Sequence, residues 1–166
     1  MKSAKAREPR RPPRAPRDPE GLINEYHRRV AALFGEFRSA TSERERRRIA
    51  ERICHLVSAQ CDVEEEILYP QANRVGRRPD NRIRAAQLEG AFVRKVVEEI
   101  RSLPSDDRRL TATMDILHDY LDDYVDQQRA EVLPRLRRGG SGTGTLYEAM
   151  LHRRNELLAD ARRMNA

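Results

Sequence analysis

Two segments of the sequence decide the fold, Gln60-Cys-Asp-Val-Glu-Glu-Glu-Ile-Leu-Tyr-Pro70 and Tyr124-Val-Asp-Gln-Gln-Arg-Ala-Glu-Val-Leu-Pro134. In each, a polar side chain ten residues before the proline is followed by another four residues later, Gln60 with Glu64 and Tyr124 with Gln128. Side chains four apart lie on one face of a helix. We therefore interpret the two segments as repeats of one helical hairpin, with their polar pairs at the same height.

Apolar residues around these segments predict four long helices. They recur at spacings of three and four, as in core-facing helices, and the four stretches are 22–37, 49–67, 83–100 and 110–132. Helix-start signals precede three of them, namely Asp18 before Pro19, Ser42 before Glu45, and Asp80. Short turns between long helices make each helix antiparallel to the one before it.

The fold class expected from this pattern is all-α. Residues 19–138 should form an antiparallel up-down four-helix bundle. A Gly-rich linker over residues 139–145 then leads to an additional C-terminal helix at 146–164. This last helix either caps its own bundle or docks onto a second copy in a homodimer.

The formal net charge of +6 belongs mostly to the first residues of the chain. Residues 1–18 contain seven Lys and Arg against Glu8 and Asp18, and four prolines. Such a basic, Pro-rich segment buries little apolar surface, so we predict a disordered tail. It either contacts nucleic acid or an acidic partner, with the bundle as a dimerisation body, or is a solvated extension.

Nothing in the sequence predicts export or a transmembrane segment. The first residues are basic and Pro-rich, without the apolar stretch of a secretory signal, and no run reaches the roughly 18 apolar residues of a membrane span. Cys54 and Cys61 lie seven residues apart on one predicted helix, too far to form a disulfide with each other. We expect reduced thiols and a cytoplasmic location.

Two stretches resemble hemerythrin-like (HHE cation-binding) domains. Leu22-Ile-Asn-Glu-Tyr-His27-Arg-Arg-Val-Ala-Ala-Leu-Phe34 is similar to the first helix of that family, and Glu64-Glu-Glu-Ile-Leu-Tyr-Pro70 to the end of its second. In the family, a His on the first helix, a His-x-x-x-Glu on the second, a His on the third and a His-x-x-x-Glu on the fourth hold two irons. Those irons bind oxygen, nitric oxide or peroxide, or are stored.

The resemblance implies a central polar layer that has lost most of its ligands. Only the first His and the carboxylate of the second helix keep their identity, while glutamine, glycine, tyrosine and glutamine replace the others. In this sequence the six positions are His27, Gln60, Glu64, Gly90, Tyr124 and Gln128. Gly90 leaves space that Phe92 or a neighbour fills, or that takes water or a small polar ligand.

The chemistry of this layer favours a protein without a metal cofactor. A non-haem iron site needs imidazoles and carboxylates, and the layer offers one of each. We therefore expect a non-catalytic sensor, regulator or scaffold that binds an unidentified protein or small polar ligand. The alternative is iron, either one ion held weakly by His27, Glu64 and Tyr124 or a non-standard di-iron site. Such a protein would handle oxygen, nitric oxide or peroxide, or oxidise a small substrate.

Overall fold

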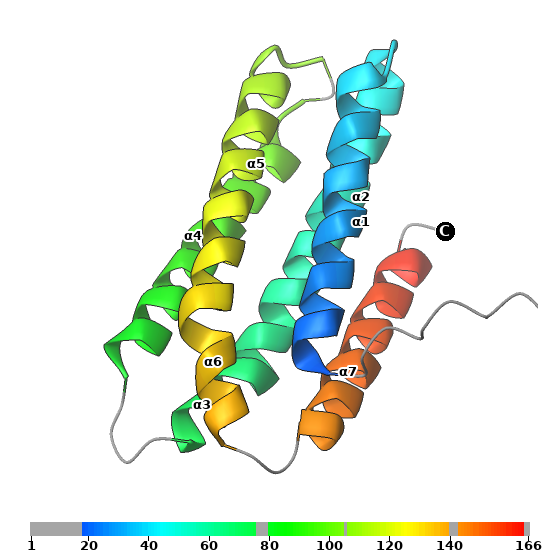
Figure 1. Cartoon of the computed structure of the whole chain (residues 1–166). Helices are drawn as coiled ribbons and strands as arrows, with labels where there is room; N and C mark the ends of the chain where they lie inside the picture. Colours follow the sequence, from blue (N-terminus) through cyan, green and yellow to red (C-terminus); the bar gives the residue numbers. More distant parts are fainter. Residues whose placement is uncertain (1–17, 76–79, 105, 140–142, 165–166) are drawn as a thin grey trace, which may run out of the picture.

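Four long helices lie side by side and form an antiparallel bundle (Figure 1). The computed structural model describes residues 18–75, 80–104, 106–139 and 143–164. The long helices are α1 (Pro19–Ser39), α2 (Glu43–Val63), α4 (Asn81–Ser102) and α5 (Arg109–Gln127). The prediction of an all-α up-down bundle with an additional C-terminal helix is confirmed.

The predicted start signals cap three of the helices. Asp18 Oδ1 accepts a hydrogen bond of 2.6 Å from the backbone N–H of Gly21 at the start of α1. Ser42 and Asp80 cap α2 and α4 in the same way. A cap of this kind stabilises a helix by about 1 kcal/mol, because it satisfies a backbone donor that has no partner within the helix.

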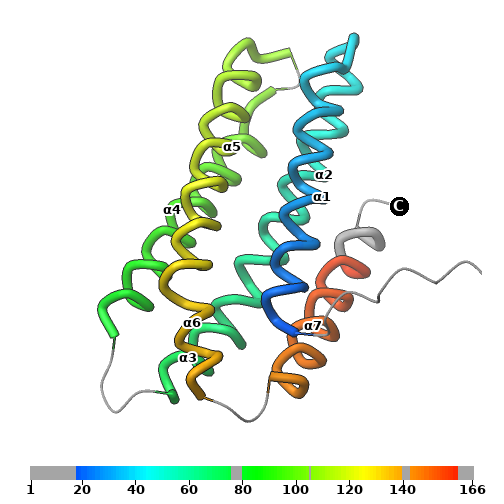
Figure 2. Tube along the Cα trace, in the orientation of Figure 1, coloured from blue at the N-terminus to red at the C-terminus, as the bar shows by residue number. Residues whose placement is uncertain are grey.

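The second and fourth helices continue past Pro70 and Pro134 by about one turn. From α2 the chain passes through the π-helical turn η1 (Glu64–Leu68) into α3 (Tyr69–Arg74). From α5 it passes through a second π-helical turn, η2 (Gln128–Val132), into α6 (Leu133–Arg138). Figure 2 shows α3 and α6 continuing the bundle at its lower end.

The π-helical turns allow the helices to accommodate proline. Pro70 and Pro134 each occupy the second position after such a turn. A proline lacks the N–H for the usual helical bond, and its ring clashes with the carbonyl four residues earlier. In the wider turns, the N–H of Tyr69 bonds to Glu64 O and that of Leu133 to Gln128 O. One extra residue is thereby inserted before each proline without ending the helix.

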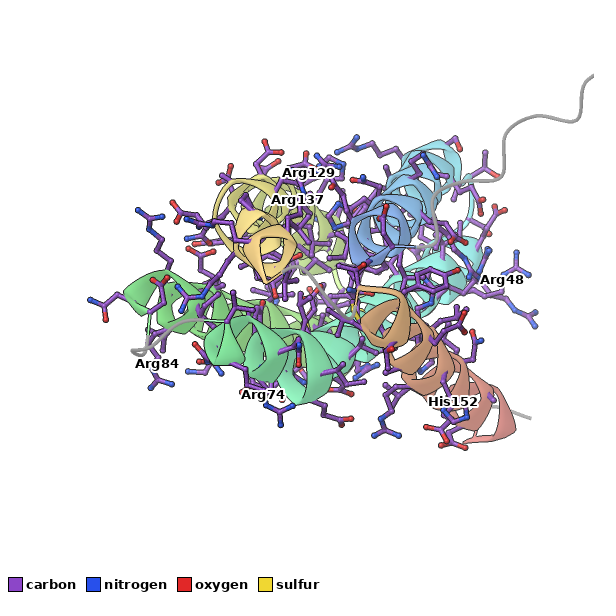
Figure 3. All side chains as sticks on the ribbon, turned by 60° about the horizontal axis from the view of Figure 1, so that its bottom comes forward. Arg48, Arg74, Arg84, Arg129, Arg137 and His152 are labelled. Atoms are coloured by element: carbon purple, nitrogen blue, oxygen red, sulfur yellow. The ribbon has the colours of Figure 1, made fainter. Side chains whose placement is uncertain are left out.

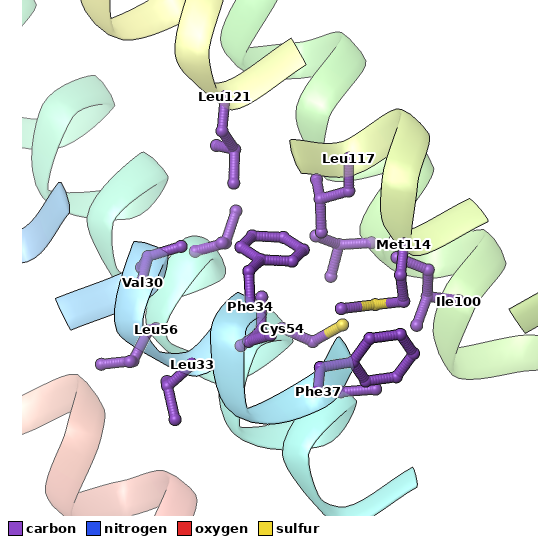
Figure 4. Packing of buried hydrophobic residues seen from close by; sticks show 14 of the residues in the cluster. Val30, Leu33, Phe34, Phe37, Cys54, Leu56, Ile100, Met114, Leu117 and Leu121 are labelled. Atoms are coloured by element: carbon purple, nitrogen blue, oxygen red, sulfur yellow. The ribbon is translucent and has the colours of Figure 1, made fainter. Parts of the chain in front are cut away.

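The buried apolar residues form two clusters, one above and one below the level of Glu64. The upper cluster includes Phe34, Phe37, Cys54, Met114 and Leu117 (Figure 4). The lower cluster includes Ile23, Leu68, Tyr69, Ile83 and Met150. Both the α2 and the α5 sequences pass from one cluster to the other through the predicted polar pairs. A polar layer therefore divides the core.

The C-terminal helix α7 (Thr143–Met164) packs on its own bundle. It begins three residues earlier than expected and lies beside the lower halves of α1 and α2 (Figure 1). Leu146 and Met150 are buried in the lower cluster, and Arg153 Nε lies 2.7 Å from Glu66 Oε2 in η1. Of the two arrangements considered, the structure shows the one in which this helix caps its own bundle.

Two sequence interpretations fall partly outside the described residues. These are the basic tail, described only at Asp18, and the centre of the Gly-rich linker, residues 140–142. The predicted end of the linker, residues 143–145, is helical and belongs to α7. Along the rest of the chain, no helix is both long and apolar enough to cross a membrane.

Truncating Met150 tests whether α7 is an integral part of the fold. Met150 is fully buried, so Met150→Ala should lower the free energy of unfolding by about 2–5 kcal/mol. Urea unfolding followed by circular dichroism measures this change. Glu148→Ala, at an exposed position of the same helix, is the control and should change the value by no more than about 0.5 kcal/mol. Equal effects of the two substitutions would contradict the docking of α7.

Candidate functional site

A buried carboxylate, that of Glu64, is the centre of the polar layer. Its Oε1 accepts a hydrogen bond of 2.6 Å from Gln60 Nε2, one helical turn earlier. Its Oε2 accepts a hydrogen bond from the hydroxyl of Tyr124 on the opposite hairpin. The two hairpins are therefore joined at the predicted height by a contact between their equivalent polar pairs.

Tyr69 extends this network, and sequence reasoning did not identify it as a site residue. Its hydroxyl contacts that of Tyr124 and accepts a hydrogen bond of 3.1 Å from Gln128 Nε2. Because Gln128 donates to Tyr69, the simplest proton arrangement has Tyr69 donating to Tyr124 and Tyr124 donating to Glu64. The donors then follow one direction, toward the carboxylate. The proline after Tyr69 was the signal in the sequence that could have identified this residue. The wider turn before it changes the helical phase and brings Tyr69 to the face of Glu64.

Gly90 on α4 provides the room for the Tyr124 hydroxyl. A Cβ atom at position 90 would lie 3.2 Å from that hydroxyl oxygen, closer than an ordinary van der Waals contact. Tyr124, rather than Phe92, therefore fills the space beside the glycine, since Phe92 is exposed on the surface. The glycine is explained by close packing against a tyrosine that is held by two hydrogen-bonding partners.

His27 lies outside the hydrogen-bonded network. It is half-buried on α1 and lines a groove of about 360 Å³ between α1 and α5, together with Phe34 and His118. Its Nδ1 atom is buried and has no hydrogen-bond partner among the described residues. Burial and then the charge of Arg129 lower the pKa of His27 to about 4, against an opposing effect of Asp126. His27 is thus a neutral side chain of the groove.

The neighbouring Tyr26 is the side chain of α1 that lies nearer the polar layer. Its ring is buried, and its pKa is raised well above the usual value by burial and then by the charges of Cys61 and Glu64. Adjacent residues of a helix differ by about 100° in direction. The structure therefore brings together five of the six predicted layer residues, and Gly90 is counted among them because it packs against Tyr124. His27 instead lines the groove between α1 and α5.

Burial also controls the protonation of the layer. It raises the pKa of Glu64, while hydrogen bonds from Tyr124, Gln60 and Gln128 act in the opposite direction. Burial and then the Glu64 charge raise the pKa of both Tyr69 and Tyr124. The two phenols consequently remain protonated at neutral pH and serve as hydrogen-bond donors.

Two buried amide oxygens of the layer, Gln60 Oε1 and Gln128 Oε1, have no partner among the described residues. An unsatisfied buried acceptor costs about 1–3 kcal/mol. Each oxygen can therefore accept a hydrogen bond from a small donor such as water. The layer keeps some capacity for a small polar molecule besides its internal contacts.

The side chains gathered in the layer do not fit a di-iron centre. They supply one carboxylate, two protonated phenols and two neutral amides, whereas iron in such sites is held by imidazoles and carboxylates. The Tyr124 hydroxyl is also committed to Glu64. Throughout the described part of the chain, no three His, Cys, Asp or Glu residues are grouped so that they could hold a metal ion.

A double-mutant cycle tests the packing of Gly90 against Tyr124. Gly90→Ala alone should lower the free energy of unfolding by about 1 kcal/mol, because crowding costs about 1–3 kcal/mol and the better helix propensity of alanine returns about 1 kcal/mol. With Tyr124→Phe as background the hydroxyl is gone, so the same substitution should stabilise by about 0.5–1 kcal/mol. Urea unfolding of the four proteins measures the coupling. An equal effect in both backgrounds would show that the contact is unimportant.

The depressed pKa of His27 predicts a loss of stability in acid. In the unfolded chain His27 takes up a proton near its ordinary pKa of 6.5, whereas the folded protein does so only near 4. The contribution of His27 to the free energy of unfolding is therefore complete above pH 6.5 and is lost as the pH falls through 4. The free energy of unfolding of His27→Asn should decrease less between neutral pH and about pH 4 than that of the wild type. The exposed His152→Asn is the control and should follow the wild type.

Comparisons with known proteins identify a similar fold. Neither a family model nor a curated protein sequence matches the chain. Among solved structures, the chain resembles a hemerythrin HHE cation-binding domain-containing protein from Mycobacterium kansasii. The TM-score is 0.72 at 16% sequence identity, over 86% of this chain and 88% of the other. The chain has the hemerythrin-like fold.

Proposed function

We propose that this protein is a hemerythrin-like bundle that has lost most of its di-iron ligands and acts as a non-catalytic sensor, regulator or binding scaffold. The observation that carries the proposal is the hydrogen-bonded chain of Gln128, Tyr69, Tyr124 and Glu64. It uses the carboxylate that a metal would need and spans the bundle between its two hairpins. The central layer then supports the fold by hydrogen bonds within the protein.

Binding is favoured over redox chemistry by the kind of groups that remain. A buried carboxylate that accepts hydrogen bonds from Gln60 and Tyr124 has little capacity left for a cation, and neutral amides are weak ligands for iron. The unpartnered oxygens of Gln60 and Gln128 suit a small hydrogen-bond donor instead. We therefore infer that a ligand of this layer is small and polar; the alternative is that the bundle binds an unidentified protein.

Iron content and optical spectrum test the proposal. Full-length protein produced in iron-supplemented medium should contain well under one iron per chain, with no absorption beyond that of its tyrosines in the near ultraviolet. Elemental analysis and an optical spectrum measure both quantities.

Variants of the layer distinguish a specific iron site from adventitiously bound metal. Restoring ligands by Gln60→His and Gln128→Glu should raise the iron content, because it supplies an imidazole and a second carboxylate at the layer. Stoichiometric iron in the wild type, with a phenolate-to-iron band that disappears in Tyr69→Phe or Tyr124→Phe, would overturn the metal-free proposal. It would support the alternative iron protein.

A further inference from the structure

The outer face of the α4–α5 hairpin exposes an unusual set of apolar side chains. Leu88 and Phe92 on α4 are 58% and 43% exposed, and Ile116 and Tyr120 on α5 are 49% and 44% exposed. They include every large hydrophobic side chain that is exposed among the described residues. The rings of Phe92 and Tyr120 lie 4.6 Å apart between centroids, so the four residues form one patch. A clustered apolar patch indicates a contact surface, unlike isolated exposed residues.

Charged residues next to this patch lack partners. Glu89 lies close enough to Asp123 that this neighbour, after burial, raises the pKa of Glu89. Lys95 is one turn from Phe92 on the same face of α4. Across the described residues, no oppositely charged group lies within ion-pair distance of Glu89, Lys95 or Asp123, although arginines pair with acidic residues over much of the remaining surface.

A groove of about 570 Å³ joins the patch to the unpaired acids. Its apolar walls include Leu88, Phe92 and Tyr120, and its polar side contains Glu89, Asp123 and Gln127. Gln127 Oε1 is buried there and accepts no hydrogen bond from any described residue. Two carboxylates and a free carbonyl oxygen beside aromatic rings suit the ammonium group of a lysine.

We propose that this face binds a second copy of the chain, and that each copy inserts its Lys95 into the acidic groove of the other. Glu89 and Lys95 lie three residues before and three residues after Phe92, which is about 4.5 Å along the helix in either direction. A twofold axis through Phe92, perpendicular to α4, packs α4 antiparallel against α4 of the second copy. Lys95 of each copy then lies opposite Glu89 of the other, with Asp123 nearby.

Self-complementarity is the reason to choose a second copy over another partner. A twofold interface must bring each surface feature against its complement on the same surface. Here the unpaired cation and the unpaired anion are equidistant from the aromatic centre, so one rotation pairs both. The same contact covers Phe92, whose ring lies against that of Tyr120, and brings the ammonium group of Lys95 as a donor toward Gln127. The docked α7 lies on the other hairpin, against α1 and α2, and leaves this face free.

Sedimentation equilibrium of the full-length protein, combined with charge reversal, tests the proposal. The wild type should sediment at twice the chain mass of 19.3 kDa. Lys95→Glu and Glu89→Lys should each raise the dimer dissociation constant about tenfold or more, because each places like charges opposite one another. The double variant Glu89→Lys with Lys95→Glu should return the dissociation constant to within about threefold of the wild type.

Two further variants control the experiment. Arg48→Glu reverses an exposed charge on α2, labelled in Figure 3, that belongs neither to the patch nor to the groove, and should leave the dissociation constant unchanged. Phe92→Ser removes the aromatic centre and should give monomers with the helix content of the wild type. A monomeric wild type would overturn the proposal. So would a dimer that is insensitive to Lys95→Glu, or a double variant as weak as either single variant.

Discussion

The hydrogen bond from Tyr124 to the buried carboxylate of Glu64 is the constraint on which the centre of this protein depends. A carboxylate removed from water is costly unless donors surround it, and this one receives them from two different helices. The need to bring the Tyr124 hydroxyl to Glu64 requires the absence of a side chain at Gly90. It also places Tyr124 beside Tyr69, which is oriented in turn by Gln128. One interaction thus constrains the side chains at positions 90, 69 and 128, which lie on three other segments of the bundle.

This polar layer divides the core and thereby fixes the alignment of the two hairpins. Apolar contacts above and below it are non-directional, so they tolerate a shift of one helix along another. Hydrogen bonds at fixed heights do not tolerate such a shift, because it would leave several buried polar groups unsatisfied at about 1–3 kcal/mol each. The layer therefore contributes to a single arrangement of the bundle, while the apolar clusters provide most of the stability.

Much of the fold was predictable, and the part of the site that was not depends on helical phase. The repeat of Gln60–Glu64 and Tyr124–Gln128, the apolar spacing and the capping residues gave the right number and direction of helices. His27 was expected in the layer, but a rotation of about 100° separates it from Tyr26. The apolar stripe of α1 contains Tyr26, which is buried, whereas His27 lies at its edge and is half-buried; His27 was expected in the layer because of the family resemblance. Tyr69 was missed because it is five residues after Glu64, a spacing that ordinary helices do not bring together.

The π-helical turns link that missed residue to the prolines. Both hairpins have such a turn at the same place, although Glu64 and Tyr69 in one correspond to Gln128 and Leu133 in the other. The side chains within the two turns differ, whereas the proline that follows each turn is shared, as expected if the wider turn accommodates the proline. The turn brings a residue and its fifth successor to one face, which lets Glu64 and Tyr69 both reach Tyr124. The backbone irregularity is therefore common to both hairpins, whereas the tyrosine that uses it, Tyr69, belongs to only one of them.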